Sequence, residues 1–433
     1  MSRRVAQYML FVVCLLYAGG VRYYRLGAVP NGLFFDEAAE GNDAARVLAS
    51  GEYRIFYPSD AGREGLWTGL IAQSERVFGK TPLAVRFWSA LAGLLTVVFT
   101  WLLAREWFGG RAAIFSAWFL ATSLWHVVFS RIEFRGILVP LFIVAAIYAL
   151  QRAVRSQGGR QMMWAGMAGI VYGVGFYSYA PYRISPLLML LCFWLWRRRP
   201  GIVRALAVFA VCAGIAAAPL GVYFVRHPHD FYGRMSEVSV FAGGHAWRAL
   251  LLNVVRTAGM FLVKGDGNWR HNIRHAPELL APVALVFLIG IGVSWRRARR
   301  FREGSKPAVV VLWWLGLLLL PEILSGDAVP HSLRAIGAIP AVFMLAGVGA
   351  DSVFAACRTR WLRWAVIAVV VLSGLVETYR YFFVWGRSAE VERAYFELTV
   401  AASKQVARLS ERVLVAVEEP PGEWKGTGFV RDG

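Results

Sequence analysis

The feature that most constrains this chain is a series of apolar segments, each about 20 residues long and joined mostly by short polar connections. A helix of about 20 residues spans the roughly 30 Å hydrocarbon core of a bilayer, where every backbone polar group must be hydrogen-bonded within the protein. Of the 433 residues, 58% are hydrophobic and only 17% are charged. The sequence therefore predicts an all-α polytopic membrane protein, crossed by helices rather than by a barrel.

We expect about eleven membrane helices. The run from Arg4 to Gly20 has the charge pattern of a signal peptide but lacks a small-residue cleavage site, so it is interpreted as a retained first span. The ten further spans are expected at residues 83–104, 112–129, 137–150, 162–177, 184–196, 202–225, 279–293, 308–324, 335–351 and 364–383.

The charge pattern indicates how these spans are oriented. A net charge of +20 would suggest nucleic acid in a soluble protein, but here the arginines form short clusters between apolar segments, so no nucleic-acid partner is expected. With the N-terminus inside, every predicted cytoplasmic loop is rich in Arg or Lys, as the positive-inside rule requires. These loops are residues 105–111, 151–161, 197–200, 296–306 and 358–363.

The first outer loop, residues 22–83, is too long for a tight connection and should be structured. Its pattern predicts two amphipathic juxtamembrane helices, at 36–49 and 65–78, lying in the membrane interface. The segment 52–58 between them is expected to be extended.

The remaining outer segments complete the domain plan. Residues 226–278 form a second long extracytoplasmic loop, and residues 1–385 together form one transmembrane module. The tail, residues 386–433, is also expected outside, with an amphipathic helix at 389–413 and a strand at 413–417.

Four carboxylates follow the first span closely, namely those of Asp36, Glu37, Glu40 and Asp43. If Asp36 caps a helix, then Asp36, Glu40 and Asp43 share one helical face. The pair Asp36 and Glu37 could simply stabilise the helix N-terminus. Alternatively, one of them is a general base with a tuned pKa, or the group binds a divalent cation through oxygen ligands.

Arginines and aromatic residues gather in the next two outer connections. Arg131 and Arg135 flank Glu133, where they could snorkel to the interface or hold a phosphate, with Glu133 orienting one of them or assisting at the reacting centre. Three tyrosines and one arginine follow the span at 162–177, and they fit either an interfacial aromatic belt or stacking against a sugar or lipid head group. These residues are Tyr177, Tyr179, Tyr182 and Arg183.

Two further outer segments contain histidines. In the long loop, His227, His229, His271 and His275 accompany acids such as Asp266. A metal site is conceivable there, but no spacing is diagnostic of zinc, so solvated loop residues are the favoured interpretation. Residues 330–334 place one histidine and one arginine before an apolar span, where they could bind an anion or anchor the interface.

The order of these motifs resembles a known family. Gly-Leu-Phe-Phe-Asp-Glu-Ala after the first span, Phe-Ser-Arg in the second outer loop, Tyr-Ser-Tyr-Ala-Pro-Tyr-Arg at 177–183 and Pro-His-Ser-Leu-Arg at 330–334 are similar to motifs of one superfamily. It comprises membrane glycosyltransferases of the protein O-mannosyltransferase and aminoarabinose transferase type, including the bacterial members of glycosyltransferase family 39. The resemblance covers about residues 1–385.

This resemblance implies a GT-C glycosyltransferase fold with its active site on the extracytoplasmic face of a bacterial or archaeal inner membrane. The donor would be a sugar on a polyprenyl phosphate, presented among the membrane lipids, and the reaction would invert the anomeric centre. No nucleotide cofactor is expected, although a divalent cation (Mg, Mn or Zn) is possible. The acceptor would be an extracytoplasmic lipid, glycan or protein.

The resemblance also assigns roles to particular residues. Asp36 would be the general base or a metal-facing carboxylate, with Glu37 and Glu133 as further catalytic candidates. The tyrosines at 177–183 would bind sugar or lipid. The candidates for the donor phosphate are Arg131, Arg135, Arg183, His331 and Arg334.

Two rivals from other functional classes remain. A transporter or flippase of lipid-linked sugars should place ionisable groups near the bilayer midplane, often on helices related by internal repeats. The predicted spans are nearly free of charge and show no repeat, which favours the enzyme. The second rival is a non-catalytic membrane assembly partner.

Overall fold

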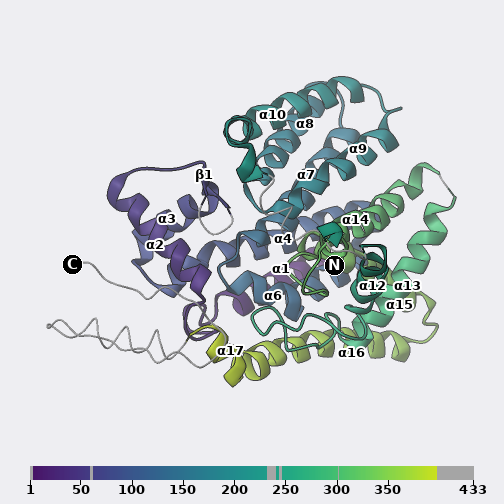
Figure 1. The fold of residues 1–433 in the computed structure, drawn as a ribbon. Helices are drawn as coiled ribbons and strands as arrows, with labels where there is room; N and C mark the ends of the chain where they lie inside the picture. The colour runs from purple at the N-terminus through teal and green to yellow at the C-terminus, as the bar shows by residue number, and fades with distance from the viewer. Residues whose placement is uncertain (1–2, 59–61, 232–239, 243–245, 301, 397–433) are drawn as a thin grey trace.

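The computed structural model describes residues 3–58, 62–231, 240–242, 246–300 and 302–396. Within these ranges the chain is mostly helical and contains one two-stranded hairpin (Figure 1). The long helices are α1 (Arg3–Tyr23), α4 (Pro82–Phe108), α7 (Leu138–Arg155), α8 (Gly158–Val174), α10 (Ile202–Arg226), α13 (Ala281–Ala298), α14 (Lys306–Ile323), α15 (Ile339–Ala356) and α16 (Arg360–Tyr379). The shorter ones are α2 (Phe35–Ser50), α3 (Gly65–Phe78), α5 (Gly110–Thr122), α6 (Leu124–Arg131), α9 (Ser185–Trp196), α12 (Ala246–Gly259) and α17 (Ala389–Ala394).

All of the predicted spans are helical, but the predicted number of membrane crossings is not confirmed. Among the described residues, eight helices are long and apolar enough to cross a membrane, or nine if α5 and α6 form one bent span. These two helices meet at an angle of 55°, because Ser123 between them leaves the helical region with ψ at 128°. The other two predicted spans are α8 and α9, which have 17 and 12 residues and so are short for a full crossing.

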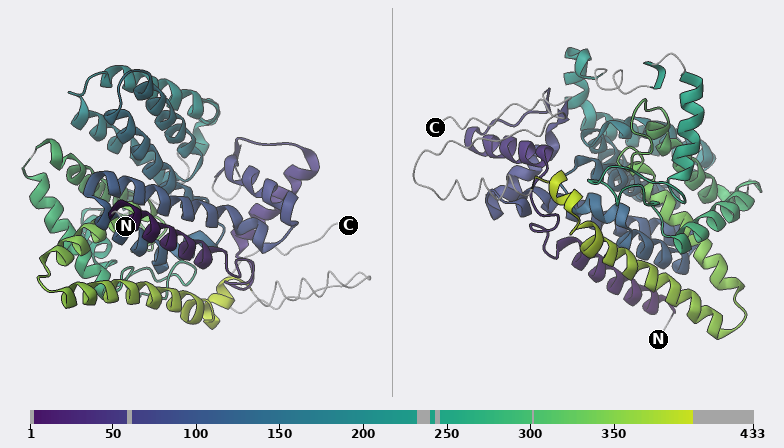
Figure 2. Two further views of the ribbon diagram at one scale, coloured as in Figure 1. Left: turned by 180° about the vertical axis from the view of Figure 1, so that it is seen from behind. Right: turned by 60° about the horizontal axis from the view of Figure 1, so that its bottom comes forward.

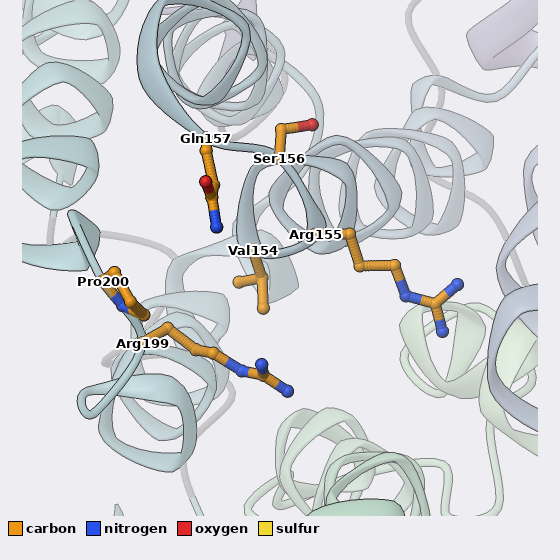
Figure 3. A pocket seen from close by; sticks show the side chains of 6 residues that line it. All are labelled: Val154, Arg155, Ser156, Gln157, Arg199 and Pro200. Atoms are coloured by element: carbon orange, nitrogen blue, oxygen red, sulfur yellow. The ribbon is translucent and has the colours of Figure 1, made fainter.

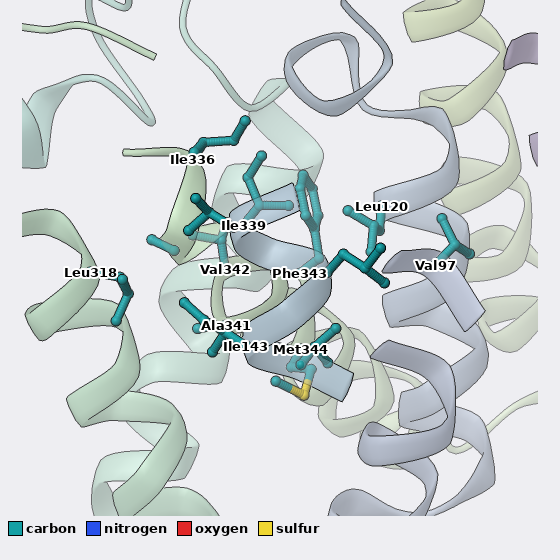
Figure 4. Close-up of a cluster of buried hydrophobic side chains, with 14 of the residues drawn as sticks. Val97, Leu120, Ile143, Leu318, Ile336, Ile339, Ala341, Val342, Phe343 and Met344 are labelled. Carbon is teal, nitrogen blue, oxygen red and sulfur yellow. The ribbon is translucent and has the colours of Figure 1, made fainter. Parts of the chain in front are cut away.

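The helices divide into an outer, lipid-facing set and an inner set. In α1, α10 and α16 only 22% of the most apolar window is buried, and side chains such as Leu16, Ile215 and Leu372 are exposed. Exposed apolar surface on this scale is expected of a protein whose solvent is lipid. In contrast, α7 and α15 are buried on nearly all sides, and Figure 4 shows α15 residues such as Val342 and Phe343 packed against Leu120 and Ile143.

Glycines allow two helix pairs to approach closely. Gly169 and Gly173 of α8 face α10, where an added Cβ would lie 2.4 Å from the carbonyl oxygens of Phe209 and Ala213 respectively. This four-residue spacing of small residues is typical of helix packing in membranes, because it permits van der Waals contact between backbones. The same principle brings Gly290 of α13 against α15.

The predicted cytoplasmic loops gather at one end of the molecule. Ion pairs join them there: Arg152 to Glu106 at 3.1 Å, Arg111 to Asp351 at 2.7 Å and Arg199 to Glu303 at 2.6 Å. The opposite end carries α2, α3, α17 and the hairpin (Figure 2). The molecule therefore has an arginine-rich end and an end that contains the acidic motif of the first outer loop.

The first outer loop closely follows its prediction, with two differences. The two amphipathic helices are confirmed as α2 and α3, but α2 begins at Phe35, one residue before the expected cap at Asp36, and Phe34 occupies the cap position. In the predicted extended segment only β1 (Phe56–Tyr57) is a strand, and it pairs in antiparallel fashion with β2 (Arg63–Glu64), which was not predicted.

The C-terminal predictions are tested only in part. The expected helix at 389–413 begins as α17 but ends at Ala394, and Tyr395 and Phe396 follow it. The rest of that segment and the strand at 413–417 lie outside the described residues. Tyr395 packs edge-on against Phe34, so the chain after the last span contributes to the outer end.

Candidate active site

Asp36 lies in the first turn of α2 and points out of the protein core. Its side chain is 54% exposed, and its Oδ2 lies 3.9 Å from Nη1 of Arg270. The Arg270 guanidinium is 3.8 Å from the centre of the Phe34 ring, so an apolar wall and a cation flank the carboxylate. The backbone carbonyl of Arg270 accepts a hydrogen bond from the Tyr395 hydroxyl at 3.2 Å, which fixes this part of the long loop over the site.

Glu37, the next residue, is buried and fully engaged. Its two carboxylate oxygens accept hydrogen bonds from Nε and Nη2 of Arg86 at 2.8 and 2.9 Å, from the Glu133 N–H at 2.8 Å and from the Phe34 N–H at 2.9 Å. Arg86 in turn donates to the carbonyls of Pro30 and Gly32. Glu37 thus joins α2, α4 and the segment that contains Glu133.

Glu133 is also buried, beneath α3. Its carboxylate accepts a hydrogen bond from the Trp67 indole N–H. Burial, reinforced by the charges of Glu40 and Glu37, raises the pKa of Glu133 well above its usual range. Burial therefore favours the protonated form of this carboxyl group.

The two remaining acids of the α2 motif hold the β hairpin. Arg63 of β2 lies 3.3 Å from the Glu40 carboxylate and 2.6 Å from that of Asp43. Glu40 also accepts a hydrogen bond from the Thr68 hydroxyl at 2.8 Å. These contacts give Glu40 and Asp43 a structural role in fastening the hairpin to α2.

Two of the expected phosphate-binding arginines converge on Glu64, an acid that the sequence did not single out. Arg135 Nε donates to Glu64 at 3.1 Å, and Arg183 Nη2 lies 3.9 Å from the same carboxylate. Arg135 also donates to the Gly62 carbonyl, and Arg183 to the Phe231 carbonyl. Their side chains are 12% and 20% exposed, so each retains a little access to the surface.

Arg131 lies in a different environment from Arg135. Its guanidinium is completely buried and donates to four backbone carbonyls between Val21 and Val29, at 2.6 to 3.1 Å. It also stacks within 5.0 Å of the Tyr381 ring. This arrangement anchors the chain that leaves the first span and uses the donors of both Nη groups, while Nε has no partner among the described residues.

The three expected sugar- or lipid-binding tyrosines separate in the structure. Tyr182 is fully buried and donates to the Tyr172 carbonyl at 2.9 Å, while the Tyr177 hydroxyl accepts the Leu220 N–H at 3.2 Å. Tyr179 lies beside Arg135, whose guanidinium is 5.8 Å from its ring centre. Of the three, Tyr179 is therefore the one that adjoins the acid and arginine network.

His331 belongs to a second cluster, which the sequence did not assemble. One ligand-type atom from each of Asp266, His271 and His331 lies within 4.8 Å of the other two, so this group could hold a metal ion. Asp266 Oδ2 accepts the Ser332 N–H at 2.8 Å and lies 3.1 Å from His271 Nδ1, and Oδ1 accepts the Asn268 N–H at 2.8 Å. The outer loops at 264–278 and 325–334 meet at this carboxylate.

Further acids surround this cluster. Glu278 accepts the Ser332 hydroxyl at 2.6 Å, and burial raises the pKa of Glu278 to about 8. Burial and the neighbouring His271 lower the pKa of His331 to about 3, so its imidazole is neutral. Arg334, an expected phosphate ligand, instead forms a 2.8 Å ion pair with Asp327.

A pocket of about 370 Å³ lies among the arginine-rich loops. Figure 3 shows the side chains that line it. Arg155 and Arg199 line it, but they are paired with Glu106 and Glu303. Arg155 contacts the end of α4, whereas Arg86, which holds Glu37, lies near its start. Since α4 has 27 residues, about 40 Å separate its ends, and the pocket is remote from Asp36.

The sequence motifs missed Arg270, Arg86 and Glu64. Arg270 lies in a loop whose charged residues were interpreted as solvated, although the Trp-Arg-His run that contains it combines aromatic and basic side chains. Arg86 could have been identified from the sequence, because an arginine within an apolar span requires a partner. Glu64 precedes α3 and resembles an ordinary solvated acid until the fold surrounds it with arginines.

Comparison with solved structures shows that the fold is similar to that of polytopic GT-C membrane glycosyltransferases. ArnT from Cupriavidus metallidurans in the apo state has a TM-score of 0.56 at 18% identity, over 92% of this chain and 77% of that one. ArnT bound to undecaprenyl phosphate gives 0.60 at 16% identity, over 95% and 82%. The oligosaccharyltransferase AglB from Archaeoglobus fulgidus, in complex with an inhibitory peptide and a dolichol-phosphate, gives 0.59 at 14% identity, over 91% of this chain and 56% of AglB.

A family match agrees with the fold. Residues 67–223 match the dolichyl-phosphate-mannose-protein mannosyltransferase family, a region that begins after Asp36 and includes Glu133 and Arg183. A comparison with curated proteins gave no match. Together, the family match and the fold support membership of the GT-C and protein O-mannosyltransferase superfamily.

Proposed function

We propose that this protein transfers a sugar from a polyprenyl-phosphate carrier to an acceptor outside the cytoplasm, with inversion at the anomeric carbon. The observation that carries the proposal is the contrast between Asp36 and Glu37. Glu37 is locked by Arg86 and two backbone N–H groups, whereas Asp36 is held in place beside it with its carboxylate exposed next to Arg270. An exposed, positioned carboxylate on the outer end of a GT-C fold suits a general base.

The chemistry follows from that placement. Asp36 takes the proton from the acceptor hydroxyl or amine as that atom attacks the anomeric carbon. The bond from this carbon to the carrier phosphate oxygen breaks, and the polyprenyl phosphate leaves with the electron pair. The charge that develops on the leaving phosphate requires a nearby cation, and a guanidinium suits its oxygens.

Arg270 is the cation best placed for the donor phosphate, since it is 25% exposed and adjoins Asp36. Arg135 and Arg183, with Tyr179 beside Arg135, form a second candidate surface for the carrier phosphate and sugar. Arg131 is assigned to positioning, because its guanidinium already binds backbone carbonyls. The related proteins ArnT and AglB have been solved with undecaprenyl phosphate and dolichol-phosphate, which supports a donor of this class.

A divalent cation at Asp36 fits the surrounding residues less well. Mg²⁺ and Mn²⁺ favour several oxygen ligands, but the Glu37 oxygens are occupied by four hydrogen bonds and Arg270 already faces Asp36. The proposal therefore has Asp36 acting directly on the acceptor proton.

The positions of ionisable groups within the helices favour the enzyme over a transporter. Arg22 lies at the end of α1, Arg86 near the start of α4, Glu322 at the end of α14 and Glu377 near the end of α16. A carrier of lipid-linked sugars would place such groups near the bilayer midplane.

The test is transfer by purified protein supplied with a panel of polyprenyl-phosphate sugars, with release of the carrier phosphate as the readout. Asp36→Asn should lower the rate by at least about 100-fold, since a general base contributes 10²–10⁴-fold. Glu52→Gln is the matched control, because Glu52 is an exposed acid of the same outer loop, and its rate should equal that of the parent. Equal rates for Asp36→Asn and the parent would exclude Asp36 as the base. If the parent releases no carrier phosphate from any donor, the proposed function fails.

A further inference from the structure

Asp266, His271 and His331 together offer more atoms that could coordinate a metal than their hydrogen bonds occupy. Asp266, His271 and His331 come from two outer loops about 60 residues apart, yet one ligand-type atom of each lies within 4.8 Å of the others. Asp266 and His271 are 3% and 2% exposed at the side chain. The imidazole rings of His271 and His331 are 4.9 Å apart between centroids, which places both beside the same carboxylate.

Several buried polar atoms around this cluster have no hydrogen-bond partner among the described residues. They are Nδ1 of His331, Oε2 of Glu278 and Oε2 of Glu322. Buried polar atoms in native structures nearly always have a partner, so three such atoms around two histidines and an aspartate indicate a missing group. A cation bound by the histidines and Asp266 would give the Nδ1 atom of His331 a partner.

Backbone N–H groups hold the carboxylate ligand of this cluster and one neighbouring acid. The Ser332 N–H and the Asn268 N–H donate to the two oxygens of Asp266, and the backbone N–H of His331 donates to Glu322 at 2.7 Å. Hydrogen bonds to a side chain that coordinates a metal fix the direction of that side chain and raise the affinity for the metal. In the described part of the chain, the hydrogen bonds that hold this carboxylate come from both of the loops that would be joined.

We propose that Asp266, His271 and His331 bind a divalent transition-metal ion, with Zn²⁺ as the preferred ion, and that this ion fastens the loop at 264–278 to the loop at 325–334. Two imidazoles and one carboxylate suit zinc better than Mg²⁺, whose preferred ligands are oxygens. Three protein ligands leave a fourth tetrahedral position for water. Because Arg270 precedes His271 and faces Asp36, the ion would also hold Arg270 in place.

This inference does not depend on the proposed transfer reaction, since its readout is the metal itself. Full-length protein purified without chelator should contain about one zinc per chain by elemental analysis. After removal of metal with a chelator, titration with Co²⁺ should give visible absorption bands of a tetrahedral site that saturate at about one equivalent. Metal-free protein should also melt at a lower temperature, because an ion that binds only the folded chain stabilises it.

Variants separate this site from incidental binding. His271→Ala and His331→Ala should each lose the bound zinc and the Co²⁺ bands. His275→Asn is the control, because His275 is an exposed histidine of the same loop at φ +60°, a conformation that asparagine tolerates, and it should retain one equivalent. The proposal is overturned if the parent contains no zinc and its metal-free form gives no Co²⁺ bands, or if the His271→Ala, His331→Ala double variant retains one equivalent.

Discussion

Asp36 and Glu37 are neighbours in the sequence but have different environments, and the difference is energetic. Glu37 is buried because it pairs with the buried Arg86, while Asp36 points away from that pair. Removing one partner of a buried ion pair leaves the other charge without compensation and costs about 3–5 kcal/mol. The buried pair is therefore a stability determinant of the end that carries α2, whereas the Asp36 carboxylate is exposed.

This contrast gives a stability prediction for Glu37. Glu37→Gln should lower the melting temperature of the detergent-purified protein strongly, because Gln keeps the shape but leaves the Arg86 charge unbalanced. The control is Asp351→Asn, which breaks the surface pair with Arg111, whose side chain is 54% exposed. A surface pair contributes about 0–1 kcal/mol, so this variant should melt close to the parent. Similar shifts in the two variants would contradict the assigned role of Glu37.

Glu133 provides a prediction of pH dependence. Its pKa is raised in the folded protein, so the folded state holds a proton that the unfolded state releases above the ordinary glutamate pKa of about 4.3. The stabilisation is complete below that ordinary pKa and is lost as pH rises through the raised value. Across pH 4–9, the melting temperature of Glu133→Gln should therefore increase relative to that of the parent as pH rises. Gln stays neutral and can still accept the hydrogen bond from Trp67. Parallel curves for the two proteins would show that Glu133 is not protonated in the fold.

At the residue scale, the sequence revealed which residue types gather at the outer end but not which of them are accessible. Arg131 and Arg135 belong to one short motif, yet the first binds backbone carbonyls and the second binds Glu64. Their difference arises from segments more than 60 residues away. The spacing of residues within a motif carries no information about such distant partners. The sequence could therefore predict the group of candidate residues but not the role of each one.

At the scale of the elements, close helix packing depends on individual glycines. An added Cβ on Gly290 of α13 would lie 1.8 Å from the Leu345 carbonyl oxygen in α15, whereas around Gly292, two residues further along, there is no heavy atom within 4 Å. The two positions share a helix and differ in the space available.

Gly290→Ala should therefore destabilise the protein by roughly 1–3 kcal/mol, because backbone cannot yield as a flexible side chain can. Gly292→Ala should be neutral or stabilising by up to about 1 kcal/mol, since alanine has the better helix propensity. The two variants are compared by size-exclusion chromatography with fluorescence detection, which measures the fraction of protein that remains monodisperse after heating. Equal survival of both variants would show that α13 and α15 do not approach as closely as described.

The elements themselves were largely predictable because their causes are local. Apolar length predicted that each of the expected spans is helical, although the number of membrane spans is not confirmed, and amphipathic spacing predicted α2 and α3 within one residue at each end. The bend at Ser123 and strand β2 were not predicted, because neither a single residue that leaves the helical region nor a two-residue strand has a periodic sequence pattern. The start of α2 was wrong by one residue since Glu37, and not Asp36, receives the Phe34 N–H.

For the whole molecule, the alternation of arginine-rich and acid-containing loops predicted that the chain has two chemically different ends. The structure gathers the arginine-rich loops through ion pairs such as Arg111 to Asp351. It also joins four separate outer segments around Glu37 and Asp266, which no single motif could predict. The remaining question at this scale is which end faces the cytoplasm.

Cysteine labelling of intact cells answers that question directly. The four native cysteines are first replaced by serine or alanine, and single cysteines are then introduced as Ser50→Cys, at the exposed end of α2, or Arg358→Cys, in the exposed turn before α16. If arginine-rich loops lie inside, a membrane-impermeant maleimide should label the Ser50→Cys protein in intact cells and the Arg358→Cys protein only after permeabilisation. Carrier-linked donors are used on the extracytoplasmic face in the proposed reaction, so Asp36 must lie on the side that is labelled from outside. The reverse pattern would place Asp36 in the cytoplasm, where the proposed reaction with an extracytoplasmic acceptor could not occur.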